Sequence, residues 1–400
     1  MQDAEPTLSS LRVLVIAPPP DFPTFPPAPN AQLSVDLPGG EHRDVTVGID
    51  GRATIEGIDW SLGSASIVAY GLPGRSVHGV MDLTATTAAM LPKPKGLQTA
   101  ADVVLYPQLL TPSASITVSG TVSSPSASMN LTLISGTRCS SVSEAGGGAY
   151  SMSCDPGKPI TLIARDEQIT VDGSTVKVAP NRWFRQDAPA PAGAVLEADI
   201  DFATATPLTP HKGTVHVKTS AALTKALPGT GSIVGVTSKE SSFVTFLGAF
   251  SSRSATATGF DFDMEWNDIA GETPYTLSVL FGSDGSVSRT LVPGAPAADQ
   301  TYDDFLAPPS MTGTLALEAP LTVHGDGGAA IIRVLVTTPT YSLVLDAPPG
   351  TKILHPPTLP ADAKAKGPLM GSVFFLDKID PDAFRFLKFA RSKSVPATLP

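Results

Sequence analysis

The residues best suited to metal or acid–base chemistry are six histidines, and their spacing matches no known site. No two of them stand four residues apart around a glutamate, the arrangement that places two zinc ligands on one helix face. His211 and His216 are the closest pair, and a strand that begins near Thr214 need not place both on one face. We interpret both histidines as polar surface residues and expect no metal ligand among them.

Two groups of carboxylates are the next candidates. Asp261, Asp263 and Glu265 alternate with aromatic and other apolar residues, which favours a strand with one hydrated and one packed face. The alternative is a Ca²⁺ site or an acidic surface for carbohydrate, although Ca²⁺ needs about six to eight oxygens, usually from converging loops. The second group contains Asp299, Asp303 and Asp304. Neither group has a partner placed for glycoside hydrolysis, so the carboxylates predict no catalysis.

Motifs for nucleophilic or cofactor chemistry are missing from the sequence. It contains no Gly-x-Ser-x-Gly elbow, no phosphate-binding loop and no dinucleotide fingerprint. A secreted hydrolase would instead need a histidine and a carboxylate that converge in a cleft between domains, with His211, His216 and Asp261 as candidates. We predict that the protein is not an enzyme and has no catalytic residue, and we keep the interdomain hydrolase as a third interpretation.

Aromatic side chains that could contact a ligand are concentrated at one place. Trp183 and Phe184 stand between Arg182 and Arg185, and paired aromatics with arginines make effective contact surfaces. The alternative is that these rings pack in a core or between domains. Exposed, coplanar rings around Trp183 or Trp266 would favour carbohydrate binding.

The only two cysteines predict a disulfide. Cys139 and Cys154 flank a cluster of glycines, and a hairpin folded about that cluster would place them opposite one another. We favour a four-residue loop at 145–148, which gives the closer antiparallel spacing and fits a disulfide. The alternative is two buried thiols. A disulfide would indicate an oxidising compartment.

Composition favours an all-β protein. Glycine and proline number 35 and 39, and only 16% of the residues are charged, whereas 42% are hydrophobic. Long helical periods are missing, and the best helix candidate, residues 219–227, is short. Such a profile predicts folded β domains with many turns.

Charge and terminal composition limit the partners and the compartment. A net charge of −10 and a pI near 5.0 argue against nucleic acid. No stretch approaches the ~20 apolar residues of a membrane helix. The polar start suggests that an export signal or lipid anchor preceded residue 1, so we expect an extracytoplasmic protein, either secreted, periplasmic or anchored at the outer surface. The alternative is an intracellular protein. The nearest approach to a basic patch, interpreted as a solvated strand edge or tail, is Arg385, Lys388, Arg391 and Lys393.

A pattern of glycine, strand, turn and second strand occurs three times. The copies are residues 51–70, 148–164 and 259–279. Their spacing indicates tandem domains joined by short proline-rich linkers. We predict β-sandwiches at 1–110, 111–203 and 204–307, the second containing the disulfide hairpin, and at 308–400 a β-rich domain or an extension of the third.

One family resemblance accompanies these copies. The segments 31–35, 49–58 and 66–70 together resemble the transthyretin-like, carboxypeptidase regulatory-type β-sandwich, and residues 148–164 are similar. The resemblance covers about half of the chain. It implies about seven strands in two sheets, an extracytoplasmic setting and no catalytic residues, since such domains are usually accessory or structural.

These expectations together describe a secreted or cell-surface protein of tandem antiparallel β-sandwiches, transthyretin-like or immunoglobulin-like. We expect a non-catalytic structural or protein-interaction scaffold. The alternative from another class is a carbohydrate-binding or Ca²⁺-dependent adhesion protein. The expected partner is a protein or a surface polysaccharide, with no cofactor except Ca²⁺ in that alternative.

Overall fold

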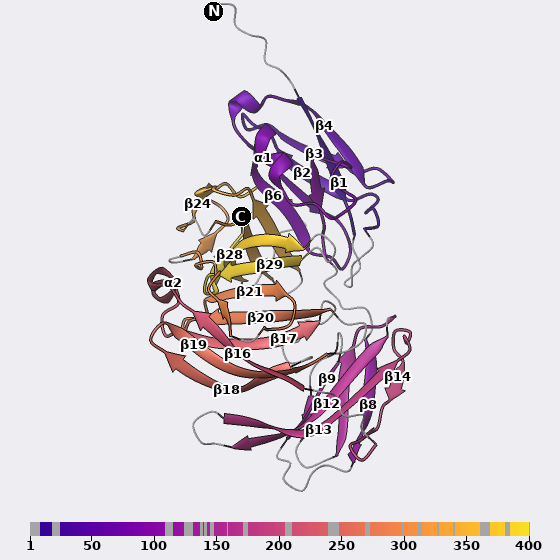
Figure 1. Cartoon of the computed structure of the whole chain (residues 1–400). Coiled ribbons are helices and arrows are strands. Elements are labelled where there is room, and N and C mark those ends of the chain that lie inside the picture. The colour runs from indigo at the N-terminus through magenta and orange to yellow at the C-terminus, as the bar shows by residue number, and fades with distance from the viewer. Residues whose placement is uncertain are drawn as a thin grey trace, which may run out of the picture.

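The computed structural model is built almost entirely of β-strands, which group into four units (Figure 1). The all-β expectation is therefore confirmed. No helix in the described part of the chain is both long and apolar enough to span a bilayer. The structure describes residues 9–17, 25–108, 115–123, 131–136, 139, 142–144, 148–157, 159–170, 175–204, 210–238, 248–268, 273–297, 299–310, 314–325, 328–338, 341–360, 369–380 and 385–399.

The first unit is a sandwich of two sheets. One sheet has the order β4-β1-β7, and the other runs β3-β2-β5-β6. Apolar side chains from both sheets form one buried cluster between them. The elements are β1 (Ser9–Val15), β2 (Gln32–Asp36), β3 (His42–Thr46), β4 (Arg52–Ile58), η1 (Trp60–Leu62), β5 (Ala65–Tyr70), β6 (Val77–Leu83), α1 (Ala85–Met90) and β7 (Val103–Leu105).

The second unit repeats this arrangement. Its sheets have the orders β11-β8-β14 and β10-β9-β12-β13, with the short β15 also paired to β8. Buried apolar residues of both sheets again form one cluster. The strands are β8 (Ile116–Ser123), β9 (Leu131–Gly136), β10 (Val142–Glu144), β11 (Ala149–Cys154), β12 (Ile160–Thr170), β13 (Thr175–Asp187), β14 (Val195–Glu197) and β15 (Ile200–Asp201).

The third unit has the same pairing order, β19-β16-β22 and β18-β17-β20-β21, with β18 also joined to β19. The short helix expected near residue 220 is present as α2, with Ser220 as its N-cap. The elements are β16 (Pro210–Lys218), α2 (Ala221–Ala226), β17 (Gly231–Ser238), β18 (Gly248–Thr256), β19 (Gly259–Asn267), β20 (Pro274–Phe281), β21 (Val287–Pro293) and β22 (Gln300–Tyr302).

The C-terminal unit has one sheet in the order β26-β25-β28-β29. Shorter pairs complete the unit, β23 with β30 and β24 with β27, and β30 also pairs with the beginning of β28. The four-strand order therefore matches the other units, although the repeated sequence pattern is not visible here. The strands are β23 (Leu315–Ala316), β24 (Leu321–Thr322), β25 (Ile331–Thr337), β26 (Ser342–Ala347), β27 (Ile353–Leu354), β28 (Leu369–Asp380), β29 (Arg385–Arg391) and β30 (Val395–Thr398).

The units do not follow one another in space in their sequence order. Strand β6 of the first unit pairs in parallel with β26, and β21 of the third unit pairs with β29. The C-terminal unit therefore lies between the first and the third, with the second at the far end (Figure 1). Backbone pairing joins three units into a sheet of 17 strands. Their relative positions are consequently set by sheet hydrogen bonds.

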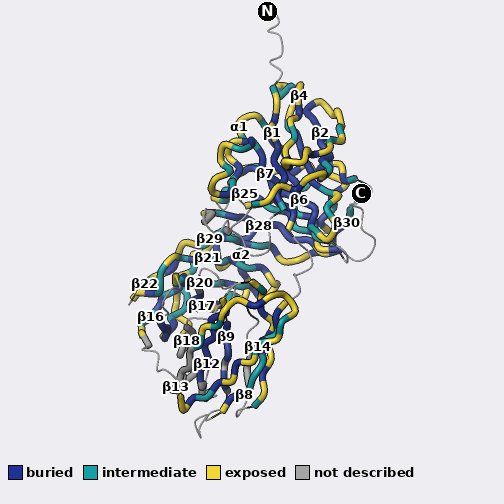
Figure 2. The backbone as a smooth tube through the Cα atoms, turned by 90° about the vertical axis from the view of Figure 1, so that its right-hand side faces the viewer, coloured by how far each residue is buried: buried dark blue, intermediate teal, exposed yellow. Residues whose placement is uncertain are grey.

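Strand β6 is buried on both faces because it belongs to two cores. Val80 packs in the first unit, whereas Val77 and Met81 pack in the C-terminal unit. Figure 2 shows such inner strands as buried, with exposed residues mostly on peripheral loops. A β-carbon on Gly79 would lie 2.7 Å from the carbonyl oxygen of Ile67 and 3.0 Å from the side chain of Leu345. Glycine at this position therefore allows the two units to approach closely.

The disulfide between Cys139 and Cys154 is confirmed, but the hairpin predicted around it is wrong. Strand β10 pairs with β9, and β11 pairs with β8 in the other sheet. The two cysteines still face one another as an isolated antiparallel bridge. The local hairpin does not form because β10 and β11 each find a more extensive partner, in different sheets. The disulfide thus links the two sheets of the second unit.

Removing the disulfide is expected to destabilise the second unit. The bond closes a loop of 15 residues, for which chain-entropy arguments give about 3 kcal/mol. A Cys139→Ser/Cys154→Ser variant should therefore unfold its second unit at lower denaturant concentration, measured by circular dichroism. Reductant should lower the stability of the native chain and leave the variant unchanged. Equal denaturation midpoints for variant and native protein would contradict the prediction.

Candidate functional site

Four polar side chains meet in the buried contact between the first and the C-terminal units. Arg333 donates to both carboxylate oxygens of Asp346, at 2.7 and 2.9 Å. The Tyr106 hydroxyl donates to Asp346 at 3.2 Å and accepts from Arg333 at 2.8 Å. His78 Nε2 lies 3.3 Å from Asp346, and its ring packs on Tyr106. These four residues, the junction cluster, join β6 and the segment after β7 to β25 and β26.

The charges of the junction cluster are determined by burial and mutual contact. Burial lowers the pKa of His78, so this ring is neutral near pH 7. Burial alone would raise the pKa of Asp346, but the Arg333 guanidinium more than offsets it and holds that pKa below the ordinary range. Burial raises the pKa of the Tyr106 hydroxyl, which stays protonated. The cluster is therefore an Arg–Asp ion pair with two neutral hydrogen-bonding neighbours.

The junction cluster is suited to holding two units together and not to contacting a substrate. The side chains of His78 and Asp346 are only 2% and 4% exposed. Breaking such a buried pair leaves an uncompensated charge, whereas the complete cluster satisfies the Asp346 carboxylate. The contacts of His78 and Tyr106 with Asp346 and Arg333 cross from the first unit to the C-terminal unit. They form only when both units are in register, so they fix the position of β6 against β26.

A second set of polar contacts extends this junction towards solvent. His355 donates its backbone N–H to Asp82 at 3.0 Å, and its ring Nδ1 lies 2.7 Å from the same carboxylate. The Thr358 N–H donates to Asp36 at 2.6 Å, and its carbonyl accepts from Ser34 at 3.0 Å. The segment after β27 is thus bound along the sheet of the first unit.

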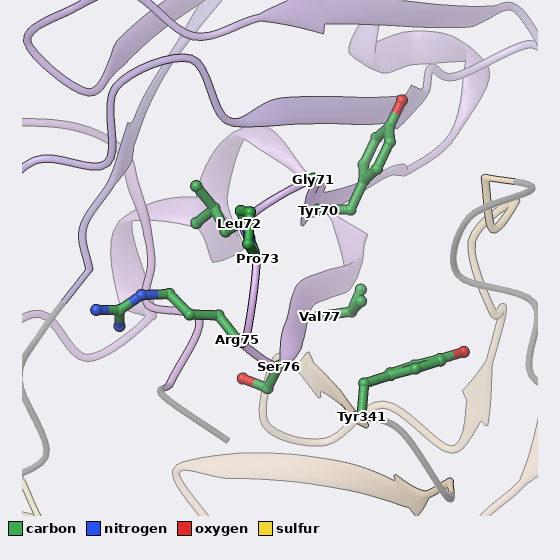
Figure 3. Close-up of a pocket in the computed structure, with 8 residues that line it drawn as sticks. All are labelled: Tyr70, Gly71, Leu72, Pro73, Arg75, Ser76, Val77 and Tyr341. Atoms are coloured by element: carbon green, nitrogen blue, oxygen red, sulfur yellow. The ribbon is translucent and has the colours of Figure 1, made fainter. Parts of the chain in front are cut away.

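A pocket of 240 Å³ opens at the end of the same junction (Figure 3). The turn between β5 and β6 forms one wall, and Tyr341 of the C-terminal unit closes the other side. Arg75 points away from Tyr341 and donates to the Pro107 carbonyl at 3.2 Å. Burial lowers the pKa of Arg75. The volume is below the range of about 300–1,000 Å³ typical of ligand sites.

Acid is expected to weaken the junction through His78. Its folded pKa is lowered from the ordinary 6.5, so below that pH the unfolded chain binds a proton that the folded chain excludes. The free energy of unfolding should therefore fall as the pH drops below about 6.5. Asp346 stabilises the fold at pH values above its unfolded pKa, near 3.8. This contribution is lost only in stronger acid. Urea unfolding between about pH 8 and about pH 5 measures the slope.

Two variants separate His78 from the other groups. His78→Gln should remove much of the acid-dependent loss. The hydrogen bond to Asp36 raises the pKa of His42, so this exposed histidine stabilises below pH 6.5 and loses that contribution as the pH rises. His42→Gln should therefore steepen the loss in acid. If His78→Gln does not change the dependence of the unfolding free energy on pH, another group causes the loss of stability in acid.

The acidic strand predicted at 261–265 lies on β19, and its side chains pair with β16. Asp261 contacts His216 at 2.8 Å, Asp263 accepts from Thr214 at 3.1 Å, and Glu265 lies 3.6 Å from Lys212. Among the described residues, no group of three or more His, Cys, Asp or Glu side chains could hold a metal ion. The carboxylates are spread along the strand, so a Ca²⁺ site at Asp261, Asp263 and Glu265 stays a prediction.

The two histidines of β16 face opposite sides of the sheet. His216 pairs with Asp261, while His211 stacks on Trp266 and lies 2.7 Å from Asp268. A histidine and a carboxylate therefore do meet at His216, but side by side on neighbouring strands. Trp266 is 7% exposed and belongs to the core of the third unit. It does not supply the exposed ring that would favour carbohydrate binding.

The predicted aromatic contact surface lies on β13. Arg182, Trp183 and Phe184 pair through their backbone with β12, and their side chains lie outside the described residues. Arg185 is half-buried and donates to Asp187 at 2.8 Å. The ligand contact at these four residues therefore stays a prediction.

The basic segment at the C-terminus is not a solvated edge. Strand β29 pairs with β28 on one side and with β21 on the other. Lys388 is 6% exposed and contacts Asp304, which Lys378 also contacts at 3.1 Å. The interpretation of Lys388 as a solvated residue is wrong because the neighbouring unit covers its strand.

Sequence analysis missed the junction cluster, although each strand carries a signal. Arg333 and Asp346 are single charges within otherwise apolar strands, and His78 interrupts another. A lone charge in a strand buried on both faces requires a partner. Arg333 and Asp346 partner one another only 13 positions apart, but their contacts with His78 and Tyr106 join residues more than 200 positions apart.

Comparisons with known proteins give only remote likenesses. No family model matches the chain, and no curated protein matches it. Among solved structures it is similar to the TIE protein of Bacillus anthracis (12% identity, TM-score 0.18, covering 74% of this chain and 49% of that one). Pilus adhesin SpaC from Lactobacillus rhamnosus GG gives 10% identity and a TM-score of 0.16, covering 86% and 43%. Two B repeat units of the collagen-binding protein of Staphylococcus aureus give 10% identity and a TM-score of 0.14, covering 95% of this chain and 98% of that one.

The chain spans less than half the length of the first two of these structures. Scores this low assign neither a family nor a function.

Proposed function

We propose that this protein is a non-catalytic, extracytoplasmic scaffold that holds β-sandwich units in a fixed arrangement and presents their loops to a partner. The observation that carries the proposal is the position of the C-terminal unit. It pairs by backbone with β6 on one side and with β21 on the other. The junction cluster adds contacts of Tyr106 and His78 in the first unit with the Arg333–Asp346 pair of the C-terminal unit, and these form only when the two units are in register.

The type of sandwich supports an accessory or structural role. In the first unit three strands face four, as the transthyretin-like resemblance implies. The second and third units have the same pairing order. Domains of this type usually present loops from a rigid framework, and their function lies in those loops. We therefore propose that these units are of the transthyretin-like type.

The disulfide supports an extracytoplasmic location. Cys139 and Cys154 are both almost fully buried and bonded, and such bonds persist in oxidising compartments. Labelling of intact source cells with a membrane-impermeant reagent tests the location. Labelled protein carrying a Cys139–Cys154 cross-linked peptide is expected, whereas protein that is shielded from the reagent and carries free thiols would contradict it.

A distance measurement tests the scaffold role. Leu62 of the first unit is 62% exposed, and Lys225 of the third unit is exposed. Both native cysteines are in the disulfide, so Leu62→Cys and Lys225→Cys accept spin labels selectively. A scaffold should give one narrow distance distribution by pulsed electron spin resonance. A broad distribution would contradict a fixed arrangement, and turnover of a substrate by the purified protein would contradict the non-catalytic role.

A further inference from the structure

A second pocket lies where the third unit meets the C-terminal unit. Its volume is 280 Å³, close to the lower end of the range for ligand sites, about 300–1,000 Å³. Strand β21, the segment around β22, and strands β28 and β29 all contribute to its lining. It contains Asp303 and Asp304, two carboxylates that sequence analysis grouped without finding a partner. We call it the β21–β29 pocket.

The polar side chains of this pocket form a balanced set of donors and acceptors. Lys378 and Lys388 contribute ammonium groups and share one oxygen of Asp304. Asp303 adds a second, exposed carboxylate. Gln300 also lines the pocket, and its amide oxygen accepts from the Ala297 N–H at 3.0 Å, which orients the amide. Two positive and two negative charges thus lie around one opening.

Apolar side chains also line the pocket. They are Leu291, Pro293 and Leu387, of which Leu291 is 2% exposed. Strand pairing between β21 and β29 holds Leu291 and Leu387 in place, with Thr290 opposite Lys388. A ligand here would meet carbon atoms as well as ions and amides.

This combination selects the chemistry of the ligand. An anion would meet two carboxylates as well as two lysines, and a purely apolar group would remove hydrogen-bonding partners from those charges. A sugar hydroxyl both donates and accepts, so it can bond an ammonium and a carboxylate at once. The C–H face of a sugar ring provides the matching apolar surface. The volume limits the ligand to one or two rings.

We infer that the β21–β29 pocket binds one or two residues of a neutral saccharide. This inference goes beyond the scaffold role, since the unit arrangement and the pocket can be tested separately. Lys388 is buried and supports the pocket by holding Asp304. Lys378 and Asp303 are exposed and supply the groups that reach the ligand. The site would give the scaffold a surface polysaccharide as its partner.

Saturation-transfer nuclear magnetic resonance with the full-length chain tests the inference. The probes are neutral tetrasaccharides of glucose, mannose, galactose and N-acetylglucosamine, with tetragalacturonate as the acidic arm. Saturable binding of at least one neutral probe is expected, with no tighter binding of the acidic one. Absence of saturable binding by every neutral probe, or preference for tetragalacturonate, would overturn the inference.

Matched variants locate the binding site. Asp303→Asn and Lys378→Gln should each weaken binding at least about fivefold, because each removes a charged hydrogen bond. Lys212→Gln is the control, since Lys212 is 75% exposed, lies near Glu265 in the same unit and does not line the pocket. Unchanged melting temperatures would show that all three variants fold. Binding that Asp303→Asn and Lys378→Gln both leave intact would place the saccharide elsewhere and overturn the assignment.

Discussion

An Asp346→Ala variant is expected to lose about 3–5 kcal/mol of unfolding free energy, because removing one partner of a buried ion pair leaves the other charge uncompensated. Arg333 would lose both charge-assisted hydrogen bonds. Tyr106 and His78 would lose their contacts with the same carboxylate. Urea unfolding of the full-length chain measures the change, and the labels at positions 62 and 225 should show a broader distance distribution.

Two further variants separate charge from packing. Arg333→Met combined with Asp346→Leu removes both charges and should be more stable than Asp346→Ala alone. Asp261→Ala is the matched control, since this aspartate is 40% exposed and pairs with His216. It should cost less than about 1 kcal/mol. A loss in Asp346→Ala no greater than that in Asp261→Ala would contradict a stabilising role for the junction cluster.

A chain that ends at residue 307 is expected to lose its fixed arrangement altogether. Strands β6 and β21 would each lose the neighbour that now covers one edge. The apolar side chains of Val77 and Met81 would lose the core they share with the C-terminal unit. Unpaired edges with adjacent apolar residues promote association between copies. We expect concentration-dependent oligomers by light scattering.

A single substitution in the longer chain disturbs only one of the two junctions. A valine at position 79 would crowd the Ile67 carbonyl in its own unit and the Leu345 side chain of the C-terminal unit. Gly79→Val should therefore strain the pairing of β5 with β6 and loosen the first unit from the C-terminal unit, while β21 and β29 stay paired. Its distance distribution should broaden without the oligomers expected of the shortened chain. A compact, monomeric chain of residues 1–307 with one narrow distribution would contradict the role given to the C-terminal unit.

The strands of single units were the predictable part of this fold. Alternating side chains and glycine turns indicated three tandem copies, and each copy corresponds to strands β4–β5, β11–β12 or β19–β20. These features are local, since a strand buried on one face shows a period of two residues. The disulfide hairpin failed for the same reason. Symmetry about the glycines describes only local pairing, whereas the two cysteine-bearing segments belong with different sheets.

The contacts between units were beyond sequence reasoning. The sequence from Val77 to Leu83 does not predict that this strand pairs with β26, which lies more than 250 positions away. The charges of Asp303 and Asp304 were visible in the sequence, but Lys378 and Lys388, which contact Asp304, lie on strands more than 70 positions further along the chain. Edge-to-edge pairing depends on the shape of whole sheets, which a single sequence does not reveal.

The spatial order of the units has a consequence for how the protein is made. The C-terminal unit leaves the ribosome after the first and third units, which both pair with it. Domains that fold earlier during synthesis therefore keep an unpaired strand edge until the C-terminal unit has folded. A nascent chain that stops early would expose the side of β6 that a finished chain conceals. Chaperones and proteases would recognise this exposed strand before the incomplete chain reached the compartment in which the protein functions.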